Sequence, residues 1–200
     1  MTESHPSDDK ALVRHRPEDL APLRHKTIVL VGLMGVGKSS VGRRLAHVLD
    51  LPFRDADNEV EAAAGRSISE IFAELGEAAF RDGERRVIAR LLDEPPHVLA
   101  TGGGAFVNPE TRALINDKAL SVWLKADVEL LARRVGRKDT RPLLKGKDPV
   151  AVLTELARIR NPAYAEAQVH VQTGDTPHGV AVDAILAALH ERQVQGASSE

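Results

Sequence analysis

The chain has 200 residues, enough for one domain of ordinary size with a buried core. Its hydrophobic fraction of 42% is typical of a globular protein, and its formal net charge of −2 argues against a general attraction to nucleic acid or to a membrane surface. The absence of cysteine excludes disulfides and thiolate metal sites.

The two ends of the chain are polar and show little periodicity. We expect a flexible extension over residues 1–25, with at most a short helical piece around 17–23, and a frayed tail over 196–200. No apolar run approaches the ~18 residues of a transmembrane helix, and the first ten residues lack the basic and apolar regions of a secretory signal. We therefore expect a cytoplasmic protein with one folded domain over residues 26–195.

Between these ends, short apolar runs alternate with helical patterns. In chain order we expect a strand at 27–33, a helix at 38–50, a strand at 52–57, helices at 67–76 and 76–93, a strand at 97–104, a helix at 109–117, a strand at 120–126, a helix at 127–136, a basic loop at 137–148, a helix at 149–167, a strand at 169–173 and a helix at 178–193. This alternation predicts an α/β fold with a parallel sheet covered on both faces. Ligands of such sheets bind beyond the carboxyl ends of the strands, so the residues that follow each strand are the first candidates for a site.

A glycine-rich segment follows the first expected strand. Residues 32–39, GLMGVGKS, fit the phosphate-binding pattern G-x-x-x-x-G-K-S/T. Glycines let backbone amides approach phosphate oxygens, and the next helix adds its free N-terminal amides and positive dipole end. Lys38 would reach the β- and γ-phosphates, and Ser39 would bind Mg²⁺. The alternative is a glycine turn with an incidental lysine, but the position between a strand and a helix favours phosphate binding.

Two aspartates follow the second expected strand. Asp55 and Asp57 are two residues apart, and such side chains point to the same side of a strand. One would hold the water shell of magnesium, and the other would orient an acceptor alcohol or take its proton. The alternative is that Asp57 caps the following helix. By contrast, Ser67 and Glu70 have the spacing of a capping box, which predicts a structural role.

A second glycine cluster, TGGGA at 101–105, follows the third expected strand. Three consecutive glycines offer backbone amides for binding an anion or a hydroxyl, and a plain turn needs fewer. The same strand end lacks the aspartate that many P-loop enzymes use for magnesium, which strengthens the case for Asp55. Asp127 is a rival after the fourth strand, but its position predicts a helix cap.

Several arginines are further candidates. In the basic loop at 137–148, Arg141 is a candidate lid residue above a transferring phosphoryl group, although a solvated loop is the simpler interpretation. Arg160, just before Pro162, is suited to a bidentate contact with a carboxylate. Arg81 lies in an arginine-rich helix whose arginines would ordinarily be solvated or ion-paired.

In order and spacing, the segments GLMGVGKSSVGRRLA, DADNEVE, GRSISEIFAELGEAAFR, TGGGA, TRPLL and RNPAY resemble those of shikimate kinases across about residues 26–195. The resemblance implies a P-loop kinase fold of the nucleoside monophosphate kinase type, with a five-stranded parallel sheet and a lid at about 136–148. It implies transfer of the γ-phosphate of ATP to the 3-hydroxyl of shikimate, which gives shikimate 3-phosphate and ADP on the route to chorismate and the aromatic amino acids. ATP and Mg²⁺ are the implied cofactors, and the implied state is a monomer without nucleic-acid or membrane partners.

The resemblance also implies roles for individual residues on the acceptor side. Asp57 would bind the substrate hydroxyls and orient or deprotonate the attacking one, while Arg81 and Arg160 would clamp the carboxylate of shikimate. Gly103 would offer its backbone to a hydroxyl. The full implied set for shikimate is Asp57, Arg81, Gly102, Gly103, Gly104 and Arg160.

On the donor side, the resemblance makes Lys38 and Arg141 the groups that stabilise the phosphoryl group in flight. Ser39 would ligate magnesium, Asp55 would support it through water, and Arg134 would stack on adenine. The full implied set for the nucleotide is Gly35, Val36, Gly37, Lys38, Ser39, Ser40, Arg134 and Arg141.

Two alternatives stay open at this point. A gluconate-type sugar-acid kinase of the same fold would also need arginines for a carboxylate. A catalytically silent binding module of the same family should have lost Lys38, Asp57 or Arg81, and all three are present.

Overall fold

The computed structural model describes residues 20–135 and 148–197. The elements run in the order η1 (Ala21–His25), β1 (Ile28–Val31), α2 (Lys38–Leu49), β2 (Phe53–Asp55), α3 (Ala56–Ala64), α4 (Ile68–Leu92), β3 (Val98–Ala100), η2 (Ala105–Val107), α5 (Pro109–Lys118), β4 (Leu120–Lys125), α6 (Val128–Val135), α7 (Pro149–Tyr164), β5 (Val169–Gln172) and α8 (His178–Ala197).

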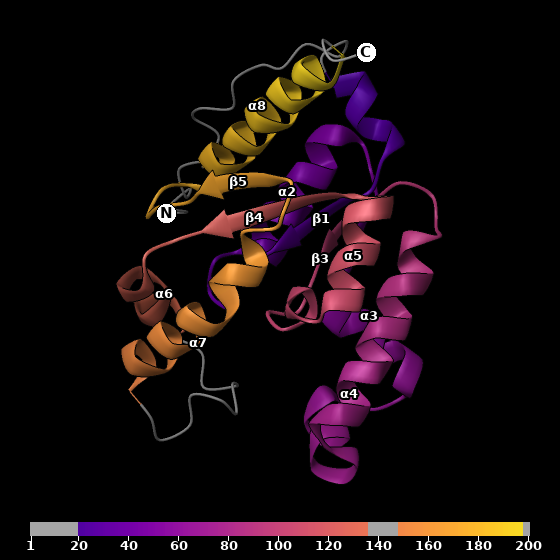
Figure 1. Ribbon diagram of the computed structural model, residues 1–200, viewed down its shortest axis with the longest axis vertical. Helices are drawn as coiled ribbons and strands as arrows, with labels where there is room; N and C mark the ends of the chain where they lie inside the picture. The colour runs from indigo at the N-terminus through magenta and orange to yellow at the C-terminus, as the bar shows by residue number, and fades with distance from the viewer. Residues whose placement is uncertain (1–19, 136–147, 198–200) are drawn as a thin grey trace, which may run out of the picture.

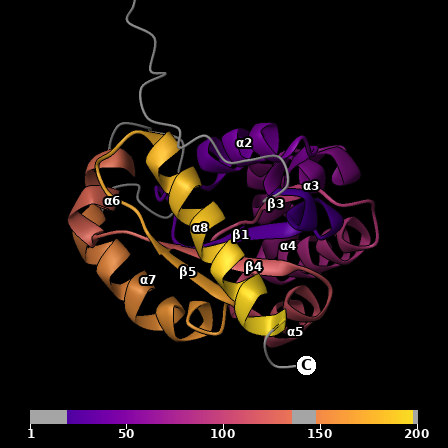
Figure 2. The same cartoon turned by 90° about the horizontal axis from the view of Figure 1, so that it is seen from above.

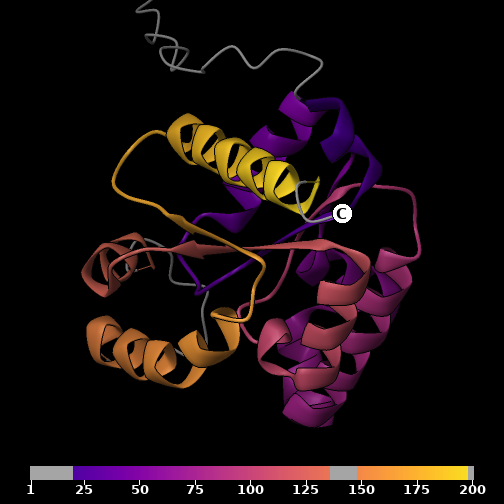
Figure 3. The same cartoon turned by 45° about the horizontal axis from the view of Figure 1, so that its top comes forward.

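The strands form one five-stranded parallel sheet in the order β2-β3-β1-β4-β5, which confirms the predicted fold class. Figures 1 and 3 show α2 and α8 on one face and α4, α5 and α7 on the other. The central strand β1 is IVLV, and all four residues are buried because strands pair with both of its edges and helices cover both faces. Viewed from above in Figure 2, α8 crosses the sheet beside β5.

The parallel arrangement brings three chain segments to one edge of the sheet. Ile28 of β1 lies opposite Val98 of β3 and Leu120 of β4, so these strands end close together. Beyond their carboxyl ends lie the phosphate loop after β1, the start of α3 after β2 and the glycines after β3. The fold therefore gathers the segments that the sequence singled out.

Helix α4 contains a break that the sequence indicated as two helices meeting at residue 76. Gly76 has φ 79° and ψ 173°, which no right-handed helix contains. The helix begins with the predicted capping box, in which the Ser67 hydroxyl accepts from the Glu70 amide and the Glu70 carboxylate accepts from the Ser67 amide. Figure 1 shows the first part of α4 reaching away from the sheet beside α3.

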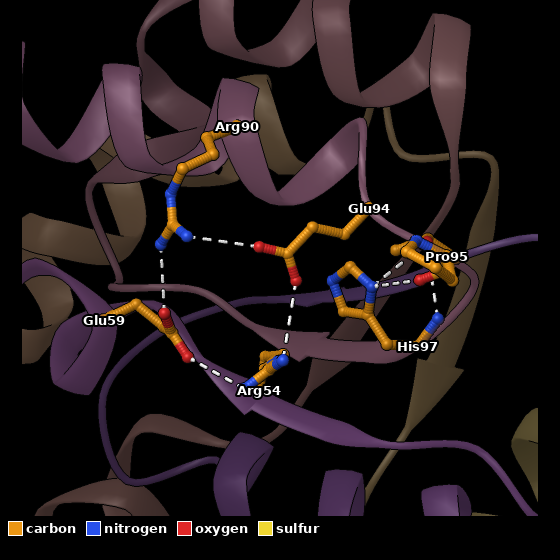
Figure 4. Close-up of polar contacts among 7 residues, drawn as sticks. Arg54, Glu59, Arg90, Glu94, Pro95 and His97 are labelled. Carbon is orange, nitrogen blue, oxygen red and sulfur yellow. Dashed lines mark hydrogen bonds and ion pairs between the residues drawn. The ribbon is translucent and has the colours of Figure 1, made fainter.

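A ring of ion pairs joins β2, α3 and the end of α4 (Figure 4). Glu59 pairs with Arg54 at 3.4 Å and with Arg90 at 3.0 Å. Glu94 pairs with the same two arginines at 3.5 and 3.2 Å. Exposed pairs contribute little one by one, so the main effect of this network is to fix how α3 and α4 lie beside the sheet edge.

The predicted strand at 52–57 was wrong in detail. Residues 56 and 57 are helical, because Asp55 ends β2 and accepts the Asp57 amide at 3.2 Å, which starts α3 there. Asp57 is therefore neither a strand residue nor the cap. The third strand ends at Ala100 and runs into its glycines as predicted, and helix 56–64 was expected only in the alternative that Asp57 caps a helix.

Other boundaries agree closely with the structure. Asp127 directly precedes α6, and its carbonyl accepts the Leu131 amide at 3.0 Å, as expected of a cap. The short helical piece near the N-terminus is the 3-10 turn Ala21–His25. The proposed lid lies almost entirely outside the described residues. In the part of the chain that is described, no helix has both the length and the apolar character needed to cross a membrane.

Candidate active site

The phosphate loop occupies residues 32–37, between β1 and α2. Gly32, Gly35 and Gly37 have φ of 137°, 83° and 95°, in the region that only glycine adopts without strain. A side chain on Gly32 would lie 2.6 Å from the Leu124 carbonyl oxygen. The loop backbone is thus free to curl before the N-terminus of α2, the arrangement expected for a triphosphate.

Lys38, the first residue of α2, reaches back across this loop. Its ammonium donates to the carbonyl oxygens of Gly32 at 2.8 Å and Leu33 at 3.0 Å. The charge therefore lies over the loop, where the β- and γ-phosphates of a bound nucleotide would be.

Ser39 and Asp55 come from different elements and meet beside the loop. The Ser39 hydroxyl donates to Oδ2 of Asp55 at 2.7 Å, while Oδ1 of Asp55 accepts the Asp57 amide. A hydroxyl and a carboxylate are hard oxygen ligands, so the pair fits Mg²⁺. Among the residues with described structure, no three His, Cys, Asp or Glu side chains cluster as a metal site.

The glycines Gly102, Gly103 and Gly104 are surrounded by charged side chains at close range. A Cβ on Gly102 would lie 2.6 Å from Oε1 of Glu84 and 2.9 Å from Oδ1 of Asp57. On Gly103 it would lie 3.1 Å from Nη1 of Arg160, and on Gly104 2.6 Å from Nη2 of Arg81. This close approach explains why three glycines occur in a row.

This glycine segment also adjoins the phosphate loop. The same Cβ on Gly103 would lie 3.6 Å from the Gly32 carbonyl oxygen and 3.7 Å from the Met34 amide nitrogen. The structure therefore brings together Asp57, Arg81 and Arg160, predicted from three distant segments, and places them next to the phosphate loop.

The charge of Asp57 is tuned by its surroundings. Protein atoms packed around the carboxyl group raise its pKa above the ordinary 3.8, and the neighbouring charge of Asp55 adds to this. The cations of Lys38 and Arg81 act in the opposite direction. A carboxylate with a raised pKa is a better proton acceptor for an alcohol.

Glu84 is a site residue that the sequence analysis missed. It is only 2% exposed, and its Oε2 accepts from Nη1 of Arg81 at 2.7 Å, while Glu77 pairs with Arg81 at 3.3 Å from the exposed side. Burial raises the pKa of Glu84 against the opposing effect of Arg81. Within the described part of the chain, Oε1 of Glu84 has no hydrogen-bond partner. The i,i+3 spacing of Arg81 and Glu84 was the available signal.

One predicted nucleotide residue, Arg134, lies apart from this cluster. Arg134 of α6 donates to the Gly174 carbonyl at 2.6 Å and lies 3.9 Å from Asp175, so it borders the segment after β5. Its stacking on adenine stays a prediction. Arg141 lies outside the described residues.

Comparisons with known proteins identify the family of the chain. The family model "Shikimate kinase" matches residues 34–190. A shikimate kinase of Caulobacter vibrioides is 87% identical over 174 residues, which is 87% of each chain, and one of Zymomonas mobilis is 57% identical over 82% of this chain and 93% of that one. A structure described as shikimate kinase from Acinetobacter baumannii in complex with shikimate superposes with a TM-score of 0.78 at 35% identity, covering 89% of this chain and 98% of that one. The chain belongs to the shikimate kinase family.

Proposed function

We propose that the shikimate kinase activity of this chain takes place between the phosphate loop and the segment Gly102–Gly104, with transfer of the γ-phosphate of ATP to the 3-hydroxyl of shikimate. The observation that carries this proposal is the convergence of Asp57, Arg81 and Arg160 on three glycines that adjoin the phosphate loop. The acceptor has one carboxylate and several hydroxyls, and these residues match both kinds of group.

On the acceptor side, we assign the carboxylate of shikimate to Arg81 and Arg160. Their guanidinium groups approach Gly104 and Gly103, so together they would hold one carboxylate by charge-assisted hydrogen bonds. The hydroxyls fall to Asp57 and to the backbone of Gly102–Gly104. Asp57 then orients the attacking hydroxyl and takes its proton as the new oxygen–phosphorus bond forms and ADP leaves.

On the donor side, the backbone of the phosphate loop and the ammonium of Lys38 would hold the β- and γ-phosphates, and Arg134 would lie beside the base. Ser39 and Asp55 would hold Mg²⁺, which offsets phosphate charge when bound. Arg141 would act on the phosphoryl group in flight. None of these proposed roles requires a residue from a second chain, so we propose a monomer.

The decisive experiment is product identification after incubation with ATP, Mg²⁺ and either shikimate or gluconate. We expect shikimate 3-phosphate and ADP from the first mixture and no phosphorylated product from the second. Phosphorylation of gluconate but not shikimate would refute the proposed acceptor. Binding of ATP and shikimate without turnover would indicate a silent binding module.

Two variants test the division between donor and acceptor. Lys38→Ala is expected to lower kcat by at least about 100-fold, because a charge that stabilises the transition state is lost.

Arg81→Ala is expected to raise the KM for shikimate while the KM for ATP stays unchanged. Arg85→Ala is the control for Arg81: it lies one turn further along α4 and pairs with Asp82 and Glu110 at the surface. An unchanged shikimate KM in Arg81→Ala would refute the carboxylate clamp.

A further inference from the structure

Tyr164 lies behind the acceptor segment and has no role in the function proposed above. It is the single tyrosine of the chain, the last residue of α7, and its side chain is fully buried. Its ring packs against Trp123 of β4, with 5.8 Å between the ring centroids. A buried phenol hydroxyl needs a hydrogen-bond partner, and the choice of partner shows what the side chain holds in place.

The hydroxyl of Tyr164 meets two groups of the acceptor site. It donates a hydrogen bond to the carbonyl oxygen of Gly103, and the guanidinium of Arg160, one helical turn earlier in α7, also interacts with the phenol oxygen. Arg160 itself lies against Gly103. The phenol hydroxyl thus hydrogen-bonds a glycine backbone group and interacts electrostatically with an arginine that we assign to shikimate.

The hydrogen bond to Gly103 has a direct consequence for the backbone. The peptide unit between Gly103 and Gly104 is planar and trans, so fixing the carbonyl of Gly103 also fixes the amide of Gly104, which points the opposite way. Glycine has the most backbone freedom of any residue, and three in a row would otherwise have many conformations. The carbonyls of Gly102 and Gly104 accept the amides of Ala105 and Val107, and the Tyr164 hydroxyl holds the Gly103 carbonyl that lies between them.

We propose that Tyr164 is a positioning residue for the acceptor, whose hydroxyl holds the Gly103 peptide and the Arg160 guanidinium in the arrangement that binds shikimate. This inference rests on the proposed assignment of Gly103 and Arg160 to shikimate. Tyr164 does not touch the reacting atoms, so it acts on binding of the acceptor and leaves the donor side alone.

The test replaces only the hydroxyl. Tyr164→Phe keeps the ring that packs on Trp123 and removes the donor to Gly103. We expect the KM and the directly measured Kd for shikimate to rise about tenfold, the effect of one lost hydrogen bond with its acceptor left buried. We expect kcat to change by less than about twofold and the KM for ATP to stay constant. The reason is that bound shikimate and the transition state lose the same binding energy.

The matched control is Ser121→Ala in β4. The Ser121 hydroxyl is also buried, donates to the Asn116 side chain at 2.5 Å and accepts the Gln168 amide at 2.9 Å, but it contacts none of the acceptor groups. Both variants are expected to lower the melting temperature, and only Tyr164→Phe is expected to weaken shikimate binding. Equal effects on shikimate in both variants, or none in a folded Tyr164→Phe protein, would overturn the inference.

A second form of the protein keeps the test decisive if Tyr164→Phe does not fold. Growth on 3-fluorotyrosine replaces this single tyrosine and no other residue. Fluorine leaves the donated hydrogen bond to Gly103 in place and adds a resonance at the phenol ring. We expect saturating shikimate to shift this ¹⁹F resonance and ATP alone to leave it unchanged, because the phenol holds the acceptor segment and not the phosphate loop. A resonance that shikimate leaves unchanged would overturn the inference.

The role of Tyr164 and the acceptor site fail in different ways. If Arg160→Ala weakens shikimate binding and Tyr164→Phe does not, the site stands and the positioning role is wrong. If Arg81→Ala and Arg160→Ala both leave shikimate binding unchanged, the site assignment itself is wrong. A role through Arg160 also predicts that Tyr164→Phe and Arg160→Lys are non-additive in a double-mutant cycle.

Discussion

At the residue scale, the arginine assigned to the acceptor carboxylate is already ion-paired with glutamates in the absence of ligand. The guanidinium of Arg81 is held by Glu84 from the buried side and by Glu77 from the surface. A carboxylate ligand would enter a group of charges that already balance one another. The buried pair with Glu84 keeps the Arg81 side chain extended toward Gly104 before any ligand binds, so less ordering is required on binding.

The raised pKa of Asp57 predicts opposite effects of charge on activity and on stability. For an acid, a folded-state pKa above the unfolded value means that the folded protein holds the proton more tightly. This carboxyl therefore costs stability as pH rises through the window that begins near 3.8. Catalysis needs the carboxylate, so kcat/KM for shikimate should fall with decreasing pH around a value above 3.8.

Asp57→Asn separates these two effects. We expect turnover to drop strongly and the melting temperature at pH 7 to rise, since the unfavourable charge is gone. Below pH 3.8 the carboxyl is protonated in both states, so the gain in melting temperature should disappear. Asp82→Asn, an exposed acid paired with Arg85 and Arg86 on the same helix α4 as Arg81, is the control and should change neither property in this way. If Asp57→Asn instead lowers the melting temperature at pH 7, the charge of Asp57 stabilises the fold and the predicted sign is wrong.

At the element scale, the break in α4 decides where its second half can lie. Both ends of α4 contact α3, through Ile68 and Arg90, and the part after Gly76 carries Arg81 and Glu84 to the glycines after β3. A straight helix of this length would direct Arg81 and Glu84 differently relative to α3. The change of helix direction at Gly76 therefore helps to place these two side chains at the site.

Exchanging two glycines of α4 tests this view. Gly76→Ala forces a side chain into a conformation that is essentially restricted to glycine, at a cost of about 1–3 kcal/mol, although nothing lies within 4 Å of the new Cβ. We expect the melting temperature to fall by about 2–10 °C. Gly83→Ala lies in regular helix with equally open space and should gain about 0.5–1 kcal/mol. Thermal unfolding of both variants measures the contrast, and a stabilised Gly76→Ala protein would contradict it.

The elements also show what the sequence can and cannot predict. The phosphate loop, the capping box of α4 and the five strands were predictable because each depends on residues close together in the chain. The start of α3 was missed because the cap is Asp55 and not Asp57. The hydrogen bond that decides this joins the Asp57 amide to the Asp55 carboxylate. Glu84 was missed because its burial depends on β3 and its glycines, which are distant in sequence.

At the scale of the whole molecule, donor and acceptor groups meet because parallel strands end at the same edge. The phosphate loop follows β1, and the acceptor glycines follow its neighbour β3. Asp55 ends β2, which is the edge strand on the other side of β3. Shikimate would therefore link groups from α3, α4, α7 and the segment after β3. A ligand that contacts so many elements should stabilise the fold as a unit.

Thermal unfolding with ligand measures this effect without turnover. Shikimate at about 100 times its Kd should add about 2.7 kcal/mol to the free energy of unfolding. For a chain of this size that corresponds to a rise of about 5–10 °C in melting temperature. The same concentration should give little or no rise with Arg81→Ala, and gluconate should give none with either protein. An equal rise in Arg81→Ala would contradict the clamp.

The contact between Tyr164 and Trp123 gives the protein an internal optical probe. Trp123 is the single tryptophan of the chain and is 9% exposed, with the His170 ring 5.2 Å away edge-on and the Lys125 ammonium 4.2 Å from the ring centroid. Its emission comes from one environment and depends on a cation, an imidazole and the phenol that holds Gly103. We therefore expect shikimate binding to change the intrinsic fluorescence of Trp123 through Tyr164, so that the acceptor site can be followed with no label attached to the protein.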